Sequence, residues 1–186
     1  MADWLVRHRA SPDAISILGM ASGCLAGLAF ALGAGHSAVW WLVGAVLVQG
    51  RLLANLLDGM VAIGRGVASP LGELFNEVPD RVSDTAVLMG LSVAAGSIGW
   101  GLAAAGAALA TAYVRAVGRG VGLPSDFRGP MAKQHRMALV TATAVVCAVW
   151  PERAMDLAWW ALVAITVLSL VTALRRLLGI GRALRP

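Results

Sequence analysis

Six long apolar segments constrain the fold of this chain more than any other feature of its sequence. They cover roughly residues 14–32, 37–62, 70–95, 101–117, 137–149 and 156–179. The sequence is 59% hydrophobic and only 13% charged, whereas a soluble domain has about 25% charged residues. Because so few polar side chains cannot coat a soluble globule, we predict an all-α, polytopic integral membrane protein with six transmembrane helices.

The ends of these segments carry the signs of helix boundaries. Ser11 and Pro12 precede the first segment as a cap-like pair, and Ser69 and Pro70 precede the third,. Residues 85–114 carry no charge at all, so the glycine-rich stretch 96–101 is the one point where a tight hairpin can separate the third segment from the fourth,. This break makes the number of spans even.

No internal repeat and no second domain divide the chain, so residues 1–186 are predicted to form one membrane domain. Residues 1–11 are too polar for a signal peptide, and we predict a short interfacial segment there, with Trp4 toward lipid and Arg7 toward the headgroups,. The two cysteines, Cys24 and Cys147, both lie inside apolar segments and are interpreted as small core residues,.

The basic residues predict the orientation. Nearly all of them fall on one side of the six-span arrangement, and Arg153 is the clear exception. The positive-inside rule then places both termini in the cytoplasm and the protein in the cell inner membrane as a multi-pass protein. Six tryptophans lie at the opposite boundary, as an aromatic belt would: Trp40, Trp41, Trp100, Trp150, Trp159 and Trp160. The net charge of +5 is therefore interpreted as topology, and no nucleic-acid partner is predicted.

Polar side chains concentrate between the second and third apolar segments. Asn55 and Asp58 are three residues apart, while Asn76, Asp80 and Asp84 are spaced by four, so each set lies on one face of a helix,. Ionisable groups within a membrane are costly and mark functional sites by default. Two such faces brought together form an oxygen-lined site in a polar cavity open to the cytoplasm, suited to Mg²⁺ or Mn²⁺.

The simpler alternative gives these carboxylates no ligand. In that interpretation they only end helices at the cytoplasmic surface and pair with nearby arginines, namely Arg51, Arg65 and Arg81.

The spacing of the polar residues matches a known signature. The sequence reads Asn55-x2-Asp58-Gly59-x2-Ala62-Ile63-x8-Gly72-x3-Asn76-x3-Asp80. It resembles the CDP-alcohol phosphatidyltransferase family, whose signature has Asp, two residues, Asp-Gly, two residues, Ala-Arg, eight residues, Gly, three residues, Asp, three residues, Asp. Every spacing fits. Three identities depart from the signature, because Asn55 and Asn76 stand at Asp positions and Ile63 stands at the Arg position.

The resemblance implies an activity and a set of roles. Members of the family transfer a phosphatidyl group from CDP-diacylglycerol, or a related CDP-alcohol, to an acceptor alcohol and release CMP in phospholipid biosynthesis. They are homodimers and use a divalent metal. Carried over to this sequence, Asp80 is the general base and a metal ligand. The other metal ligands are Asn55, Asp58 and Asn76, with Glu77 and Asp84 as further candidates, and the nucleotide lies against Asp58, Gly59, Ala62 and Gly72.

The acceptor pocket is expected in the most cationic part of the chain, residues 113–136. Arginine forks match the geometry of phosphate oxygens, and basic residues at the corresponding ends of two spans line the acceptor pocket in the family. The residues that carry this prediction are Arg115, Arg128, Lys133 and Arg136. They favour a phosphorylated acceptor, glycerol 3-phosphate or inositol phosphate; otherwise they serve as topology charges or bind lipid phosphates.

The two amides leave the activity open. Each removes one negative charge from the predicted metal site, so the chain is a working enzyme with rearranged ligands, a one-metal enzyme, or an inactive relative that acts as a lipid-binding or interaction subunit. A small transporter is a third class of function, and it is disfavoured because no acidic residue lies at the middle of a span, where transporter sites are usually found.

Overall fold

The computed structural model describes residues 1–35, 37–67 and 70–185, and within them the chain is helical throughout apart from short connections. The elements are α1 (Ala2–Arg7), α2 (Pro12–Gly33), α3 (Ala38–Gly64), α4 (Pro70–Ala94), α5 (Ile98–Gly120), α6 (Lys133–Val149), a 3₁₀ turn η1 (Pro151–Arg153) and α7 (Ala154–Ala183). Each of the six predicted segments coincides with one of the long helices α2 to α7, and α1 lies in the predicted interfacial segment.

Four helices in the described ranges are long and apolar enough to cross a membrane: α2, α3, α5 and the stretch Pro151–Ala183 that includes α7. The prediction of six spans therefore includes two further helices, α4 and α6, that do not meet this criterion. In α4 the acidic and basic residues lie within the helix, and α6 has 17 residues, fewer than the roughly 20 that a span needs. A crossing by these two helices stays a prediction.

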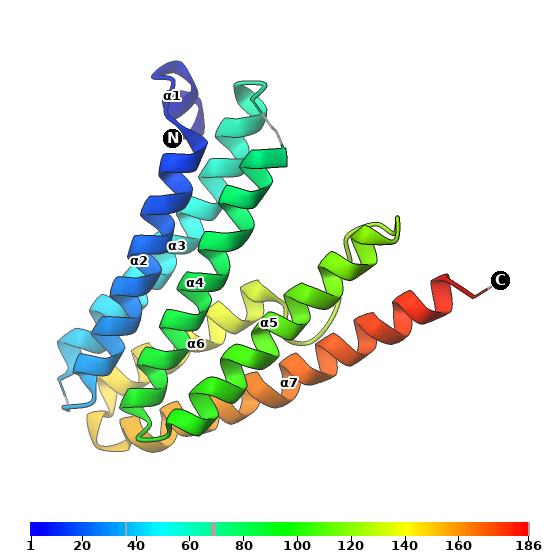
Figure 1. Ribbon diagram of the computed structural model, residues 1–186. Helices are drawn as coiled ribbons and strands as arrows, with labels where there is room; N and C mark the ends of the chain where they lie inside the picture. The colour runs from blue at the N-terminus through cyan, green and yellow to red at the C-terminus, as the bar shows by residue number, and fades with distance from the viewer. Residues whose placement is uncertain (36, 68–69, 186) are drawn as a thin grey trace.

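The helices form two groups that diverge from a common end (Figure 1). Helix α2 packs against α3 and α4, while α5 packs against α7, and α6 contacts α3 and α7. Glycines permit the tightest crossing, because a Cβ at Gly27 or Gly90 would meet the backbone of the facing helix. Helices α2 and α4 therefore lie with their backbones in close approach, as small residues allow in membrane bundles.

Two helix boundaries predicted from the sequence lie within the described residues, and both are confirmed. The Ser11 hydroxyl accepts a hydrogen bond from the backbone N–H of Ala14 at 3.4 Å, which confirms the N-cap. Between α4 and α5 the chain turns within residues 95–97, with Gly96 at φ +61°, a conformation that favours glycine,. The tight hairpin is thus confirmed, whereas Ser69 lies outside the described residues.

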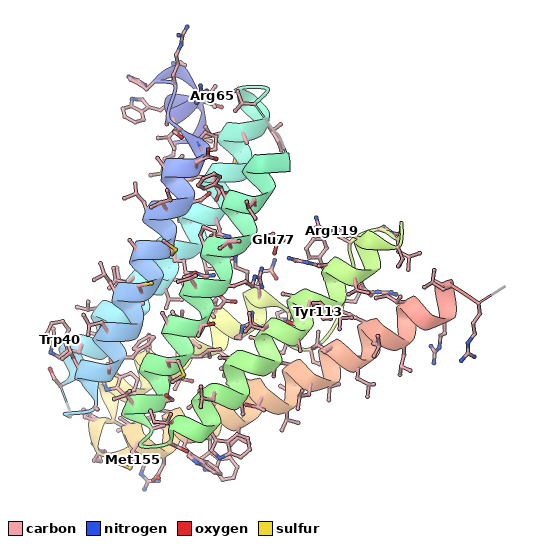
Figure 2. All side chains as sticks on the ribbon, in the orientation of Figure 1. Trp40, Arg65, Glu77, Tyr113, Arg119 and Met155 are labelled. Atoms are coloured by element: carbon pink, nitrogen blue, oxygen red, sulfur yellow. The ribbon has the colours of Figure 1, made fainter. Side chains whose placement is uncertain are left out.

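The two ends of the molecule differ in composition. Helix α1 and the last turns of α7 both lie away from the end where the two groups meet (Figure 1). Trp40 and Met155 lie at the opposite end, far from Arg65 (Figure 2). Large apolar side chains also cover the outer surface, for example Leu18 at 68% and Val46 at 70% exposure. An apolar exterior of this kind suits a protein surrounded by lipid.

Candidate active site

Asp58 lies near the end of α3 and is held by two neutral donors. Its Oδ2 accepts a hydrogen bond from the Ser16 hydroxyl of α2 at 2.6 Å, and its Oδ1 accepts one from the backbone N–H of Gly59 at 2.6 Å. The residue is 3% exposed. Asp58 therefore has a fixed orientation, and no described cation makes an ion pair with it.

Asp80 of α4 is surrounded by donors from three directions. Its Oδ1 accepts hydrogen bonds from Arg51 at 3.2 Å and from the Asn55 amide at 2.7 Å, both on α3. Its Oδ2 contacts the ammonium of Lys133 at the start of α6. Both oxygens of this carboxylate are thus engaged, one by α3 and the other by α6.

Asp84, one turn further along α4, belongs to a buried ion cluster. Arg51 approaches its Oδ1 at 2.5 Å and Arg136 donates to its Oδ2 at 2.6 Å. Arg51 also donates to the Ser83 hydroxyl at 2.5 Å. Charged side chains can be buried in this way only because each has an oppositely charged partner. One Arg51 nitrogen and two Arg136 nitrogens have no hydrogen-bond partner within the described part of the chain.

Glu77, the other additional acidic candidate, also pairs with arginines. Its Oε2 accepts from Arg81 at 2.9 Å and its Oε1 accepts from Arg115 of α5 at 2.7 Å. Figure 2 labels Glu77 on α4 and, on α5, Arg119 and Tyr113. Glu77 and Asp84 are therefore both paired with arginines, and their suggested share in a metal site stays a prediction.

Two cavities meet at Asn76. The Asp58 cavity, of about 450 Å³, is lined by Ser16 of α2, by the α3 stretch from Asp58 to Ile63 in part, and by Gly72 and Asn76 of α4. It contains all four residues assigned to the nucleotide, namely Asp58, Gly59, Ala62 and Gly72. The cationic cavity, of about 260 Å³, contains Asn55, Asp80 and six basic side chains: Arg81, Arg115, Arg119, Lys133, Arg136 and Arg176. Asn76 lines both cavities.

Three of the four residues predicted to bind the acceptor line the cationic cavity: Arg115, Lys133 and Arg136. Arg128 does not, since its side chain is 87% exposed and its guanidinium donates to Asp126 two residues before it, at 3.0 Å. These hydrogen bonds from Arg128 lower the pKa of Asp126. Arg128 is thus directed away from the cavity by a local partner.

The sequence reasoning did not assign Arg176 of α7 to the pocket. Its side chain is held in place by two backbone carbonyls, that of Arg128 at 2.9 Å and that of Thr111 at 3.1 Å. It is 5% exposed. The sequence did contain a signal, because Arg175 and Arg176 interrupt a long apolar run. Only one of these adjacent arginines can share the face of α7 that packs toward α5.

The side chains around Asp80 do not fit a divalent metal ion as they stand. A site for Mg²⁺ or Mn²⁺ needs several free oxygen ligands, mainly carboxylates. The Asn55 amide directs its NH₂ group to Asp80, since an ionised carboxylate can only accept hydrogen bonds,. Asn55 therefore presents a donor to Asp80 where a metal site needs an oxygen. Among the described residues, no three His, Cys, Asp or Glu side chains are grouped closely enough to hold a metal. Of the two signature carboxylates, Asp58 and Asp80, only Asp58 has no cationic partner within the described part of the chain.

Curated proteins with related sequences were found along most of the chain, although no family model matches it. A phosphatidylinositol phosphate synthase from Mycobacteroides abscessus is 30% identical over 189 residues, which cover 95% of this chain and 80% of that protein. An archaetidylinositol phosphate synthase from Aeropyrum pernix is 30% identical over 140 residues, covering 75% and 70%.

Solved structures share the fold. The crystal structure of Mycobacterium tuberculosis phosphatidylinositol phosphate synthase with CDP-DAG bound has a TM-score of 0.78 and 26% identity, and the match covers 96% of this chain and 90% of that one. A second structure of the same enzyme, in complex with manganese and citrate, has the same TM-score and identity and covers 97% and 87%.

The chain therefore belongs to the CDP-alcohol phosphatidyltransferase family, as its spaced motif predicts. Its relatives are phosphatidylinositol phosphate synthases and related enzymes of membrane lipid synthesis. Divalent metal appears in the manganese complex of the Mycobacterium tuberculosis enzyme.

Proposed function

We propose that this chain transfers a phosphatidyl group from CDP-diacylglycerol, or a similar CDP-alcohol, to a phosphorylated alcohol and releases CMP. The observation that carries the proposal is the meeting of two unlike cavities on either side of one motif. The Asp58 cavity contains the residues assigned to the nucleotide, and the cationic cavity gathers six basic side chains beside Asp80. The donor and the acceptor thus have adjoining places.

The reaction follows from this arrangement. The acceptor hydroxyl oxygen attacks the phosphorus that carries the diacylglycerol, a new P–O bond forms, and the P–O bond to CMP breaks. The hydroxyl proton passes to Asp80, the general base. Arg51 and Asn55 hold Oδ1 of that carboxylate. Oδ2, on the side of α6, is therefore the oxygen that receives the proton. Ser16 and Gly59 orient Asp58 toward the nucleotide.

The acceptor class follows from the charge of the second cavity. Arg115, Arg136 and Arg176 lie on three different helices and line one small volume. Two nitrogens of the buried Arg136 have no hydrogen-bond partner within the described chain, which suits a site that a phosphate completes,. We favour inositol phosphate or glycerol 3-phosphate as acceptor on this ground. The names of the relatives favour inositol phosphate.

The sequence predicts Mg²⁺ or Mn²⁺, and the comparisons do not distinguish the two ions. The manganese complex of the relative supports divalent metal use in that enzyme. In this chain Asp58 is compatible with a metal, but Asp80 is engaged by three donors. No step of the proposed reaction is therefore routed through a metal ion.

The setting is a membrane with the active site on its cytoplasmic side. Arg65, Arg119, α1 and the last turns of α7 lie away from the end where the two helix groups meet, and Trp40 lies near that end (Figures 1 and 2). This polarity supports an inner-membrane protein with cytoplasmic termini. The lipid tails of the donor then remain in the bilayer while its headgroup reacts. A homodimer stays a prediction from the family resemblance.

The second candidate function is a non-catalytic family member that binds nucleotide lipid or another protein. Asn55 and Asn76 favour it, because they remove two charges from the signature. Retained CDP binding with no CMP release in the presence of any acceptor would select this alternative.

The test is CMP release by the purified full chain with CDP-diacylglycerol and one of four acceptors: inositol phosphate, glycerol 3-phosphate, inositol or serine. Assays are run in parallel with a chelator, with Mg²⁺ and with Mn²⁺. We expect release with a phosphorylated acceptor only. Release with inositol or serine at the same rate would overturn the assignment of the acceptor class.

A variant of the cationic cavity sharpens this test. Arg115→Gln removes a charge that lines the cavity, and we expect the KM for the phosphorylated acceptor to rise about tenfold, since a charge-assisted hydrogen bond contributes about 1.5–3 kcal/mol. The KM for CDP-diacylglycerol should stay nearly constant. Arg153→Gln is the matched control, because Arg153 lies in η1 and lines neither cavity. Equal rises for both substrates would remove Arg115 from the acceptor pocket.

A further inference from the structure

We propose that Lys133 is a built-in cation at Asp80, and that this chain binds the pyrophosphate of a CDP-alcohol without a divalent metal ion. The proposal rests on the proposed function, because it concerns the same nucleotide site. Its basis is the disagreement between the signature of the family, which provides four carboxylates, and the donors that actually surround Asp80.

The identity of the residue supports this role. Lys133 is the only lysine in a sequence whose other basic side chains, histidines aside, are all arginines. An ammonium is a compact point charge, whereas a guanidinium is a planar fork. The one compact cation of the chain thus contacts the one signature carboxylate that faces the cationic cavity. A compact charge is also the feature of a metal ion that a carboxylate site recognises.

The donors on Asp80 leave little room for a second cation. Arg51 is fully buried and holds Asp80, Asp84 and the Ser83 hydroxyl at once, so it cannot withdraw without breaking the ion cluster. Asn55 occupies the same carboxylate oxygen as Arg51 with its amide donor. The remaining oxygen contacts Lys133 and lies 3.8 Å from the guanidinium of Arg81. A metal at Asp80 would have to displace at least one of these groups.

The local charge argues in the same direction. Asp80 and Asp84 bring two negative charges, and they contact four cations: Arg51, Arg81, Lys133 and Arg136. A divalent ion would therefore enter a cluster that is already positive, where repulsion between like charges in a partly buried site is strong. Glu77 does not neutralise this charge, because it pairs with Arg81 and also with a further cation, Arg115.

The anionic ligand then meets the chain's own charge. Lys133 lines the cationic cavity next to Asn55 and Asn76, and Asn76 also lines the Asp58 cavity. A pyrophosphate that extends from the nucleotide residues toward Asp80 reaches the ammonium at this junction. In this chain Asn55 and Asn76 are neutral at the positions where added carboxylates would restore a metal site.

The experiment measures metal binding and nucleotide binding separately, on the full chain in detergent micelles. Mn²⁺ alone is titrated and followed by electron paramagnetic resonance, and CDP is titrated by calorimetry with a chelator or with Mn²⁺. We expect no Mn²⁺ binding above empty micelles and the same CDP affinity in both conditions. Stoichiometric Mn²⁺ binding, or CDP binding that the chelator abolishes, would overturn the proposal.

Variants extend the test. In the presence of the chelator, Lys133→Met should lower CDP affinity about tenfold, Lys133→Arg should keep most of it, and Arg153→Met is the matched control for loss of one charge. Unchanged CDP affinity in Lys133→Met overturns the proposal. The Asn55→Asp/Asn76→Asp double variant should gain Mn²⁺ binding, and it retains every cation if Lys133→Met fails to fold.

The outcomes keep the two proposals apart. If the natural chain binds no CDP under any condition, the proposed function fails on that result. The Mn²⁺ titration then still decides whether Lys133 takes the place of a metal at Asp80, because it needs no nucleotide: a stoichiometric metal site overturns that role, and its absence together with a gain in the double variant supports it.

Discussion

The Asp58 cavity and the cationic cavity are built from the same motif but differ in charge. Asp58 accepts hydrogen bonds only from a hydroxyl and a backbone N–H, whereas Asp80 contacts three cations and an amide. Both carboxylates are nearly fully buried. The motif therefore decides where a carboxylate is placed, and the helices that pack around it decide its electrostatic environment.

This difference suggests a division of labour. A carboxylate with neutral donors keeps its negative charge available to a ligand, while one that is paired with cations shares its charge with them. In the proposed reaction Asp58 belongs to the nucleotide and Asp80 to the reacting hydroxyl. The following changes test that division, beginning with the largest expected effect.

Asp80→Asn should lower the rate of CMP release by about 100-fold or more, because loss of a general base typically costs 10²–10⁴ in rate. Asn keeps the size of the side chain. Asp156→Asn, exposed at the start of α7, is the control and should leave the rate unchanged. If Asp58→Asn reduces kcat as strongly as Asp80→Asn while CDP affinity is retained, the two carboxylates do not divide the work as proposed.

Arg51→Met should reduce the free energy of unfolding by about 3–5 kcal/mol, since removing one partner of a buried ion pair leaves the other charge uncompensated. Unfolding in mixed detergent micelles measures this change. Arg65→Met is the control, because Arg65 makes a hydrogen bond to the carbonyl of Ala10 and lines the Asp58 cavity at its edge; about 1 kcal/mol is expected there. Equal losses of unfolding free energy in the two variants would show that the buried ion cluster contributes no more to stability than a single hydrogen bond.

Ser16→Ala should weaken CDP binding by about three- to tenfold, because it removes the hydroxyl that orients Asp58,. The matched control is Ser22→Ala, which removes another hydrogen bond between α2 and α3, from Ser22 to the carbonyl of Leu47 at 2.8 Å. Calorimetry with CDP measures both. A similar loss in the control would assign the effect to helix packing instead of to Asp58.

Asp126→Asn tests a charge pair outside both cavities and should have the smallest effect. Hydrogen bonds from Arg128 lower the pKa of Asp126 in the folded chain. The pair therefore contributes its stability above the unfolded pKa of about 3.9 and loses it as the pH falls through the lower folded value. Below about pH 4, the midpoint of thermal unfolding should fall slightly less steeply with decreasing pH in the variant than in the natural chain. An unchanged slope would contradict the pairing.

Much of the fold was predictable because its determinants are local. The apolar segments coincide with α2 to α7, and the Ser11 cap and the turn at Gly96 occur where the sequence predicts them. Two helices, α4 and α6, fall short of the length or the apolar character that alone would predict a span. The prediction that they cross the membrane was supported by the placement of basic residues on one side. The lengths and composition of the two helices do not test it.

The site was predictable in part. The spacing placed Asn55 and Asp58 on one helix, and Asn76 and Asp80 on the next. It left open which cation each carboxylate meets. The general alternative, in which acidic residues pair with arginines, describes Glu77 and Asp84 in this structure.

The sequence by itself determined the helices, the family and the face on which each polar residue lies, because hydrophobic length, caps and helical spacing act within one segment. Only the tertiary structure decided that Lys133 contacts Asp80, that Arg176 lines the cationic cavity and that Arg128 does not. These contacts join residues about 50 or more positions apart, or replace a distant partner by the neighbouring Asp126. They depend on how α6 and α7 pack, which no local pattern encodes.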